Sequence, residues 1–291
     1  MYYKYFLIDL IILKNVIIIL IYKYTNVSKY LQLKIMIKNL VNNLFKKILN
    51  NFDYKMFNIK SELTPRLNGV NLNVGCGNYT IKGLISLDYY SKAYYCSKKF
   101  IHIQYDMRND LMPYDDNSVD NIYCSHVIEH IEAKYVKKFL FECVRILKKG
   151  GVLRIACPDT EYLYHQLIHH PEFFSWHKDY EGLISNARKC FVELVAEPKY
   201  KLENFGLSKK FEDYQYTDLV EELRNGLSFD EEKPGSHINS WDFTRISKFA
   251  KEAKFSCVEK SRFQSSIKQV FRARDMDLTQ PLIALYVELI K

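Results

Sequence analysis

The sequence contains no C-x-x-C pair, although its 291 residues include seven cysteines. Paired thiols at that spacing would indicate a structural metal site or a redox centre, and an odd number does not suit a disulfide framework. Most of the cysteines fall within apolar runs, where a thiol behaves as a small hydrophobic side chain. We therefore predict a reducing, cytoplasmic compartment and no metal site. The cysteines are Cys76, Cys96, Cys124, Cys143, Cys157, Cys190 and Cys257.

The folded body also lacks net charge, although the whole chain carries a formal charge of +8. Residues 1–60 hold ten lysines, no arginine and only two acids, Asp9 and Asp53. The other 231 residues carry 32 basic and 32 acidic side chains. The global charge therefore gives no support to a basic surface for nucleic acid, and only a local basic groove stays open as an alternative.

No apolar run is long enough for a clear membrane span. The longest candidate, residues 6–22, has 17 residues and is interrupted by Asp9, Lys14 and Asn15, whereas a span needs about 20 predominantly apolar residues. No small-residue cleavage site follows it. Three interpretations stay open: a membrane anchor, a packed or poorly ordered leader, and an upstream extension of a protein whose translation starts at Met36.

Residues 31–52 follow a helical pattern, with apolar side chains at three-to-four spacing and lysine or asparagine between them. This basic amphipathic helix either packs on the body of the protein or contacts an anionic membrane surface. We expect residues 1–60 to be a basic extension, residues 61–291 to form one α/β domain, and residues 160–236 to be an insertion on its acceptor side.

A glycine loop follows the first predicted strand, residues 70–74. Gly75, Cys76 and Gly77 stand where the carboxyl end of a strand meets ligand in open α/β sheets, and small residues let the backbone approach that ligand closely. The loop fails the dinucleotide fingerprint, because Thr80 replaces its third glycine and the next strand-end acid, Asp88, comes too early.

Acids end the next two predicted strands, at residues 84–88 and 100–105. Asp88 can accept hydrogen bonds from both hydroxyls of a ribose, and Asp106 with Met107 suits an adenine ring, one accepting from its amine and the other packing on its face. Each acid alone would be read as a solvated loop residue. Their order after a glycine loop predicts a nucleoside site.

The rest of the chain completes an α/β pattern. Residues 119–124 and 152–157 read as strands, joined by a helix that we expect to continue to Lys148 and Lys149 and stop at Gly150-Gly151. A helix begins near Ser240, and residues 255–263 and 281–290 read as two final strands. The predicted fold is a Rossmann-like, doubly wound sheet of seven mostly parallel strands with helices on both faces and an antiparallel final strand.

The segments NVGCGN, ISLD, YDMRNDLMPYDDNSVDNIYCSHVIEHI and ECVRILKKGGVLRIACPD resemble the successive motifs of class I S-adenosylmethionine-dependent methyltransferases. The likeness is to the type 11 group, which includes many small-molecule and sugar methyltransferases. It is dense over residues 72–159 and looser over 237–291, and it is specific for the cofactor rather than for the acceptor.

The resemblance implies a role for each matching residue. Gly75, Cys76 and Gly77 would wrap the methionine and ribose portions, Asp88 would hold the ribose, and Asp106 and Met107 would contact adenine. Ser125 and His126 would line the sulfonium side. Asn73 departs from the family pattern, because many members carry an acid there, although its amide oxygen can still accept from the methionyl amine.

Two histidines are candidates for the base that a hydroxyl acceptor needs. His130 corresponds to a histidine near the acceptor in some sugar O-methyltransferases that the segment resembles, and His237 is the second candidate. The alternatives are a turn residue bonded to the backbone for His130 and a solvated loop residue for His237. Trp241, Asp242 and Arg245 are further candidates for acceptor contacts.

The insertion between the fifth strand and the tail holds two aromatic groups, one at 173–180 and one at 211–216. The resemblance implies an acceptor lid, and the alternative is a small satellite core. We predict O-methylation of a sugar or glycan precursor. A protein or RNA methyltransferase, a non-catalytic S-adenosylmethionine-binding module at a membrane and a dinucleotide oxidoreductase are the alternatives.

Overall fold

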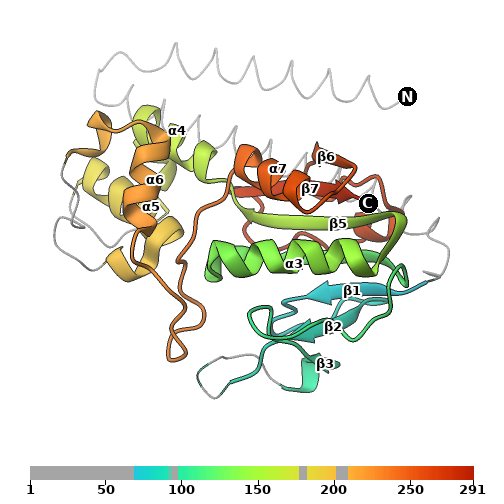
Figure 1. Ribbon diagram of the computed structural model, residues 1–291. Coiled ribbons are helices and arrows are strands. Elements are labelled where there is room, and N and C mark those ends of the chain that lie inside the picture. Colours follow the sequence, from blue (N-terminus) through green and yellow to red (C-terminus); the bar gives the residue numbers. More distant parts are fainter. Residues whose placement is uncertain (1–68, 92, 94–97, 177–181, 201–208) are drawn as a thin grey trace, which may run out of the picture. The chain divides into compact units, whose positions relative to one another are not determined.

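The computed structural model describes residues 69–91, 93, 98–176, 182–200 and 209–291 (Figure 1). The chain divides into two units, Met1–Thr64 and Pro65–Lys291, and every described residue belongs to the second. The leader and the amphipathic helix predicted within residues 1–60 lie outside the described residues. No helix in the described ranges is long and apolar enough to cross a membrane.

The described part of the chain is built on a seven-stranded sheet with the order β3-β2-β1-β4-β5-β7-β6. Neighbouring strands are parallel, except that β7 runs antiparallel to both β5 and β6. This confirms the predicted fold class. The strands are β1 (Asn71–Val74), β2 (Ile85–Asp88), β3 (Ile103–Gln104), β4 (Val119–Ser125), β5 (Leu147–Pro158), β6 (Cys257–Lys260) and β7 (Ala284–Ile290).

The two faces of the sheet are covered differently. Successive strand residues point to opposite faces, so Ile122 and Leu153 join the main core under α3 (Ala133–Ile146) and α7 (Phe243–Glu252). Tyr123 and Val152 point the other way, into a smaller core. That core includes side chains from 261–283, where the 3₁₀ helix η6 (Gln269–Arg272) lies. Among the described residues, α3 and α7 therefore cover one face of the sheet, and the segment that contains η6 packs on the other.

The end of α3 differs from the prediction. The helix stops at Ile146, and Leu147 already pairs with Val119 of β4. The register of β4 and β5 shifts before Val152 pairs with Asn121, so residues 148–151 form an irregular turn within β5. Gly151 belongs there for a packing reason, because a Cβ atom would lie 2.8 Å from the carbonyl oxygen of Asp120.

The edges of the sheet also differ in detail. The third strand covers only two residues rather than the predicted 100–105. The two tail strands, predicted at residues 255–263 and 281–290, are shorter and pair antiparallel, and residues 261–283 connect them. The helix predicted near Ser240 begins at Phe243, because the Asp242 side chain accepts a hydrogen bond from the Arg245 backbone N–H and caps it.

The insertion forms a separate helical lobe. Its elements are α4 (Thr160–His169), η3 (Pro171–Phe174), α5 (Leu183–Tyr200), η5 (Phe211–Asp213) and α6 (Tyr216–Arg224). Figure 1 shows α4, α5 and α6 grouped beyond the end of the sheet toward which β1 and β2 point. Phe174, Phe191, Phe211 and Tyr214 are buried together in a core of this lobe. The satellite core that the aromatic groups suggested is therefore present.

A buried ionic network fastens the irregular 261–283 segment to the sheet. Arg154 of β5 is completely buried, and its guanidinium lies 2.6 Å from Asp277 and 3.0 Å from Glu288, both also buried. It donates as well to the carbonyl oxygens of Arg262 and Ser265. The buried guanidinium is satisfied by these acceptors, and it supplies the positive charge that the two buried carboxylates need.

We predict that Arg154→Met destabilises the fold strongly. The substitution leaves two buried carboxylates without their cation, which costs about 3–5 kcal/mol. Lys148→Met is the control, because the Lys148–Asp120 ion pair is partly exposed and such pairs are worth about 0–1 kcal/mol. Urea unfolding of the three proteins measures the difference. Equal midpoints for both variants would contradict a structural role for the network.

Candidate functional site

The glycine loop follows the carboxyl end of β1 and is hydrogen-bonded to the carboxyl end of β2, where the backbone N–H of Gly75 donates to the carbonyl oxygen of Leu87 at 2.8 Å. Gly75 has a φ of +76°, and a Cβ atom there would lie 2.0 Å from a methyl carbon of Val127, so only glycine fits. The backbone N–H of Gly77 donates to Asp88 Oδ2 at 2.7 Å, and that of Tyr89 donates to Asp88 Oδ1 at 2.7 Å. Asp88 therefore holds the shape of the loop that precedes it.

A pocket opens at these strand ends and encloses about 600 Å³ of empty space, partly open to solvent. The structure brings five of the predicted cofactor residues to its wall, together with the base candidate His130. The five are Gly75, Asp88, Asp106, Met107 and His126.

The other predicted cofactor residues are not among those that line the pocket. Cys76 is buried, with Sγ 3.6 Å from the carbonyl oxygens of Gly77 and Phe100. Ser125 ends β4 and is also buried. Asn73 of β1 is 2 % exposed, and among the described residues its Nδ2 has no hydrogen-bond partner. A buried, unpaired amide two residues before the glycine loop fits a site that receives a polar ligand group.

Asp106 is held by its own loop. Oδ1 accepts from the backbone N–H and Nε of Arg108, and Oδ2 accepts from Arg108 Nη2 and Asn109 Nδ2. Burial raises the pKa of Asp106, but these bonds outweigh it and hold the pKa below its usual range. All four lone pairs of the carboxylate are used. Its bond to an adenine amine therefore stays a prediction, and the observed role of Asp106 is to orient Arg108.

Sequence reasoning missed Arg108, Tyr89 and Phe229, which complete the wall. The Arg108 guanidinium lies 3.8 Å from the ring centre of Phe229 and 5.0 Å from that of Tyr89. Stacking of this kind contributes about 0.5–2 kcal/mol, depending on exposure. Arg108 directly follows the Asp106-Met107 pair, so its place after that motif was the available signal.

Phe229 belongs to a long connection that we call the strap, residues 225–240, between α6 and α7. Figure 1 shows the strap as an orange loop that leaves α6, passes the ends of the strands and returns to α7. Phe229, Pro234 and Gly235 line the pocket, and Glu231 accepts hydrogen bonds from Tyr89 and Arg108. The insertion thus covers the pocket with its strap, while its helices form the separate lobe.

A histidine and glutamate cluster lies at the end of β4. His126 has a φ of +54°, which is unusual for a residue with a side chain, and the 3₁₀ helix η2 (Ile128–His130) follows it. His126 Nδ1 lies 3.0 Å from Glu129 Oε1. The rings of His130 and His237 have their centres 4.7 Å apart. The two predicted base candidates are therefore neighbours.

The charges in this cluster are interdependent. Burial alone would raise the pKa of Glu129, but His126, His130 and His237 lower it to about 2. Burial lowers the pKa of His130, and Glu129 opposes that shift only in part. We therefore expect an ionised Glu129 beside a neutral His130 near neutral pH.

The hydrogen bonds of the two histidines test the alternatives for them. His130 Nδ1 lies 3.2 Å from the carbonyl oxygen of Ser236. One ring nitrogen of His130 is therefore bonded to the backbone, as the alternative interpretation expected. His237 Nδ1 lies 2.8 Å from the carbonyl oxygen of Leu194. His237 is therefore not a solvated loop residue.

Trp241 and Asp242, two of the candidates for acceptor contacts, do not line the cofactor pocket. Trp241 is 1 % exposed, and its indole N–H donates to the carbonyl oxygen of Ile128, which supports η2 from below. Asp242 caps α7 and accepts from the Tyr216 hydroxyl. Arg245 does line a second, polar pocket, where burial lowers its pKa to about 10. Other residues of that pocket are Glu132, Asp218, Glu221, Glu222, Arg224 and Asn239.

Comparison with known proteins agrees with this geometry. Residues 72–155, from β1 to within β5, match the family model described as a methyltransferase domain. No curated protein matches the chain. Solved structures with a similar fold include an S-adenosylmethionine-dependent methyltransferase from Archaeoglobus fulgidus (14 % identity, 84 % of this chain and 99 % of that chain, TM-score 0.40).

Two further solved structures are similar in the same way. A TehB-like methyltransferase from Corynebacterium glutamicum is 12 % identical and covers 87 % of this chain and 99 % of its own, with a TM-score of 0.36. PKMT2 from Rickettsia typhi in complex with AdoHcy is 14 % identical over 79 % of this chain and 50 % of its own, with a TM-score of 0.36. The family match and the strand order identify residues 72–155 as a methyltransferase domain of the class I, S-adenosylmethionine-dependent type.

Proposed function

We propose that this methyltransferase methylates a hydroxyl group of a small molecule, of the class of sugars and glycan precursors. The observation that carries the proposal is the cluster of His126, Glu129, His130 and His237 at the end of β4, where His126 and His130 line the cofactor pocket. An amine nitrogen attacks with a lone pair that it already has. A hydroxyl acceptor needs a group that takes its proton.

The cofactor supplies a methyl group on a sulfonium centre, and its transfer is an in-line displacement. The protein must therefore align the acceptor and exclude water, and the strap covers the pocket as that requires. Ser236 O can only accept a hydrogen bond, so the proton of His130 lies on Nδ1. The lone pair on Nε2 is then able to take the acceptor proton. His237 packs against His130 and positions it.

The cofactor residues keep the roles that their places suggest, as part of the proposal. Asp88 holds the ribose hydroxyls, and Met107 packs on the adenine face. The loop from Gly75 to Gly77 passes the methionine portion, whose amine approaches Asn73. Ser125 and His126 lie on the sulfonium side, and Asp106 acts through Arg108.

The second pocket supports a polar acceptor. It combines acids with Arg224 and Arg245, and it begins at Glu132, directly after the cofactor-pocket residue Ile131. The presence of both donors and acceptors suits a polyhydroxylated molecule, since each hydroxyl can both donate and accept. A protein or RNA methyltransferase would instead methylate a macromolecule, and a non-catalytic binding module would bind cofactor without turnover on any acceptor.

We predict that Asp88→Asn weakens binding of S-adenosylhomocysteine at least tenfold. The substitution removes the charge that strengthens bonds to the ribose, and hydrogen bonds to charged groups contribute about 1.5–3 kcal/mol. Asp115→Asn is the control, because Asp115 is exposed and does not line the pocket. Calorimetric titration with S-adenosylhomocysteine, and with NAD as a second ligand, measures the effect. Unchanged affinity in the variant, or tighter binding of NAD, would refute the cofactor site.

We predict that Phe229→Ala makes S-adenosylhomocysteine dissociate about tenfold faster. The variant removes the ring that stacks on Arg108 and closes the pocket, a loss of about 1–2 kcal/mol. Leu282→Ala is the control, since Leu282 is 81 % exposed and lies outside the pocket wall. Stopped-flow displacement measures the rates. Equal rates in the two variants would show that the strap does not retain the cofactor.

We predict that His130→Asn lowers turnover by about 10²–10⁴, the usual contribution of a positioned acid or base. Asparagine can keep the donor to Ser236 O but lacks the second ring nitrogen. The assay uses labelled S-adenosylmethionine with panels of sugars, amines, peptides and RNA. A methyl ether on a sugar supports the proposal, and a methylated amine, peptide or RNA contradicts it. S-adenosylhomocysteine affinity should change less than threefold, and His169→Asn, in the helical lobe, should leave turnover unchanged.

A further inference from the structure

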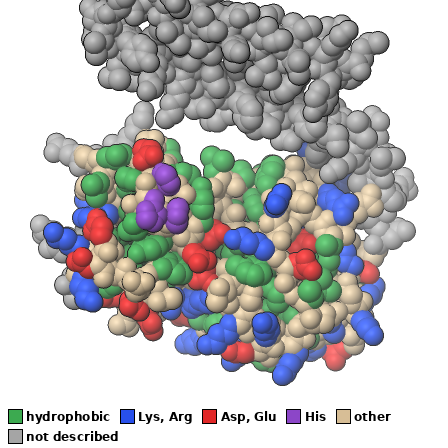
Figure 2. Space-filling view, turned by 90° about the horizontal axis from the view of Figure 1, so that it is seen from above, with side chains coloured by type: hydrophobic (Ala, Val, Ile, Leu, Met, Phe, Trp, Pro, Cys, Tyr) green, Lys and Arg blue, Asp and Glu red, His purple; other side chains and the backbone are tan. Residues whose placement is uncertain are grey.

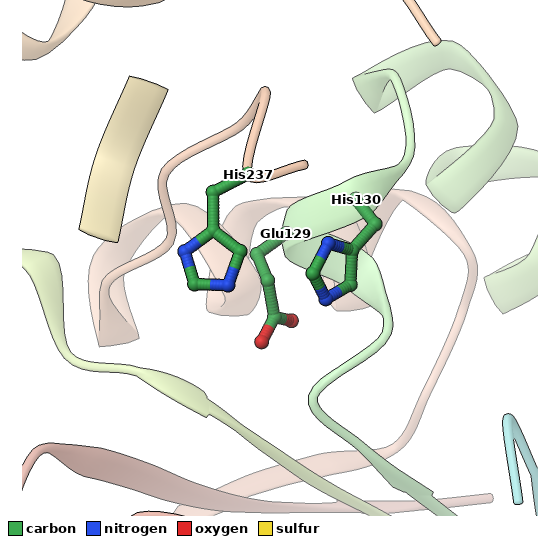
Figure 3. A group of neighbouring side chains, drawn as sticks. All are labelled: Glu129, His130 and His237. Atoms are coloured by element: carbon green, nitrogen blue, oxygen red, sulfur yellow. The ribbon is translucent and has the colours of Figure 1, made fainter. Parts of the chain in front are cut away.

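Three side chains from two distant parts of the chain lie together beside the cofactor pocket. Glu129 and His130 come from η2, and His237 comes from the strap. One ligand atom from each lies within 4.8 Å of the other two, the one such group of three in the described ranges. Figure 3 shows the carboxylate of Glu129 between the two rings, with one ring nitrogen of each histidine facing it.

The outward-facing nitrogens of both rings are already committed. His130 Nδ1 bonds the Ser236 carbonyl oxygen and His237 Nδ1 bonds the Leu194 carbonyl oxygen, so both Nε2 atoms carry lone pairs. Metal-binding histidines typically use one nitrogen for the ion and donate the other N–H to a carbonyl or carboxylate, which fixes the ring. Both rings are thus oriented as ligands before any ion arrives.

The side chain of Glu129 gives evidence for a ligand that is independent of the histidine geometry. The residue is 1 % exposed, and neither carboxylate oxygen makes a hydrogen bond within the described part of the chain. His126 Nδ1 approaches Oε1 at 3.0 Å, but out of line for a hydrogen bond. A buried carboxylate without hydrogen bonds is costly, and buried charges are usually paired or coordinate metals.

We propose that Glu129, His130 and His237 bind one divalent transition-metal ion. Two imidazoles and a carboxylate suit Zn²⁺, Co²⁺ or Fe²⁺ rather than Mg²⁺, which prefers oxygen ligands. Ligands at about 2.0–2.1 Å from a tetrahedral ion are about 3.3 Å apart, so the group closes inward from its 4.8 Å limit when it binds. Three protein ligands leave a coordination position open.

The open position gives the ion a role in the reaction, a step that rests on the proposed hydroxyl acceptor. A hydroxyl oxygen bound there loses its proton more readily, because a metal ion lowers the pKa of an oxygen ligand. The methyl group passes from sulfur to that oxygen, the proton leaves to solvent, and the products are S-adenosylhomocysteine and a methyl ether. In this arrangement His130 is a metal ligand. The metal ion, rather than the Nε2 lone pair of His130, then promotes loss of the acceptor proton.

The decisive test titrates the full chain, stripped with a chelator, with Zn²⁺ and Co²⁺ in a calorimeter. We expect one ion per chain with a dissociation constant of micromolar or below, and a visible absorption band for the Co²⁺ form. His237→Asn and Glu129→Gln should each weaken binding at least tenfold. Asparagine can keep the donor to Leu194 O, so His237→Asn removes little besides the Nε2 ligand.

A surface site is the main competitor and has its own control. Figure 2 shows histidine side chains gathered on one face of the molecule, and the rings of His165 and His169 on α4 have their centres 4.6 Å apart. His169→Asn breaks that pair. The proposal predicts unchanged binding in this variant. Loss of binding in His169→Asn with retention in His237→Asn would overturn it, as would the absence of stoichiometric binding.

Failure of the proposed function is measured separately. The same stripped protein and variants are titrated with S-adenosylhomocysteine, whose pocket His237 does not line, so retained affinity also shows that a variant is folded. Metal binding without S-adenosylhomocysteine binding would refute the proposed function and leave the metal site standing. S-adenosylhomocysteine binding without metal binding would refute the metal site alone. If His237→Asn does not fold, Glu129→Gln and the Co²⁺ spectrum decide.

Discussion

The backbone carbonyl oxygen of Glu129 joins the two halves of the site. It accepts hydrogen bonds from the N–H groups of both Ile238 and Asn239, at 2.9 and 3.0 Å. Asn239 also donates from its side chain to the carbonyl oxygen of Ile131, and Trp241 donates to that of Ile128. The end of the strap is therefore fixed to η2 bond by bond. These hydrogen bonds fix the chain directly after His237 and so hold His237 beside His130.

The same strap controls the other end of the pocket by a different kind of contact. There Phe229 stacks on Arg108, and Glu231 pairs with it at 2.7 Å. Glu231 is largely exposed, and exposed ion pairs contribute about 0–1 kcal/mol, so this end is held far less firmly than the end at Glu129. The strap is therefore fixed firmly at the cluster and held more weakly over the pocket.

The parts that could be predicted from sequence depend on chain order. A parallel sheet brings the carboxyl ends of its strands to one edge, so Gly75, Asp88 and Asp106 were bound to be neighbours once the strands were recognised. The helix end at Ile146 was misjudged because the following lysines and glycines suit a C-terminal cap, whereas pairing of Leu147 with Val119 ends the helix first. Tertiary pairing overrode a sound local signal.

The parts that could not be predicted join residues far apart in the chain. Arg108 meets Glu231 across 123 positions, and His130 meets the strap at Ser236 across 106. No local periodicity reports such contacts. The sequence does contain His126, Glu129 and His130 as one short run, but the run acquires its geometry only when the strap adds His237. The cysteine spacing that predicted no metal carries no information about a histidine and glutamate site of this kind.

The cluster combines three features that each cost stability. His126 adopts a left-handed backbone conformation, Glu129 is buried with its charge, and His130 and His237 bring two imidazoles close to that carboxylate. Strained backbone and unpaired buried charge persist where the surroundings over-determine them, and they concentrate at functional sites. Here the cluster is held by hydrogen bonds from Ile238, Asn239 and Trp241 to the carbonyl oxygens of Glu129, Ile131 and Ile128. A bound cation satisfies the carboxylate and both lone pairs at once, so the arrangement makes physical sense as a site that receives one.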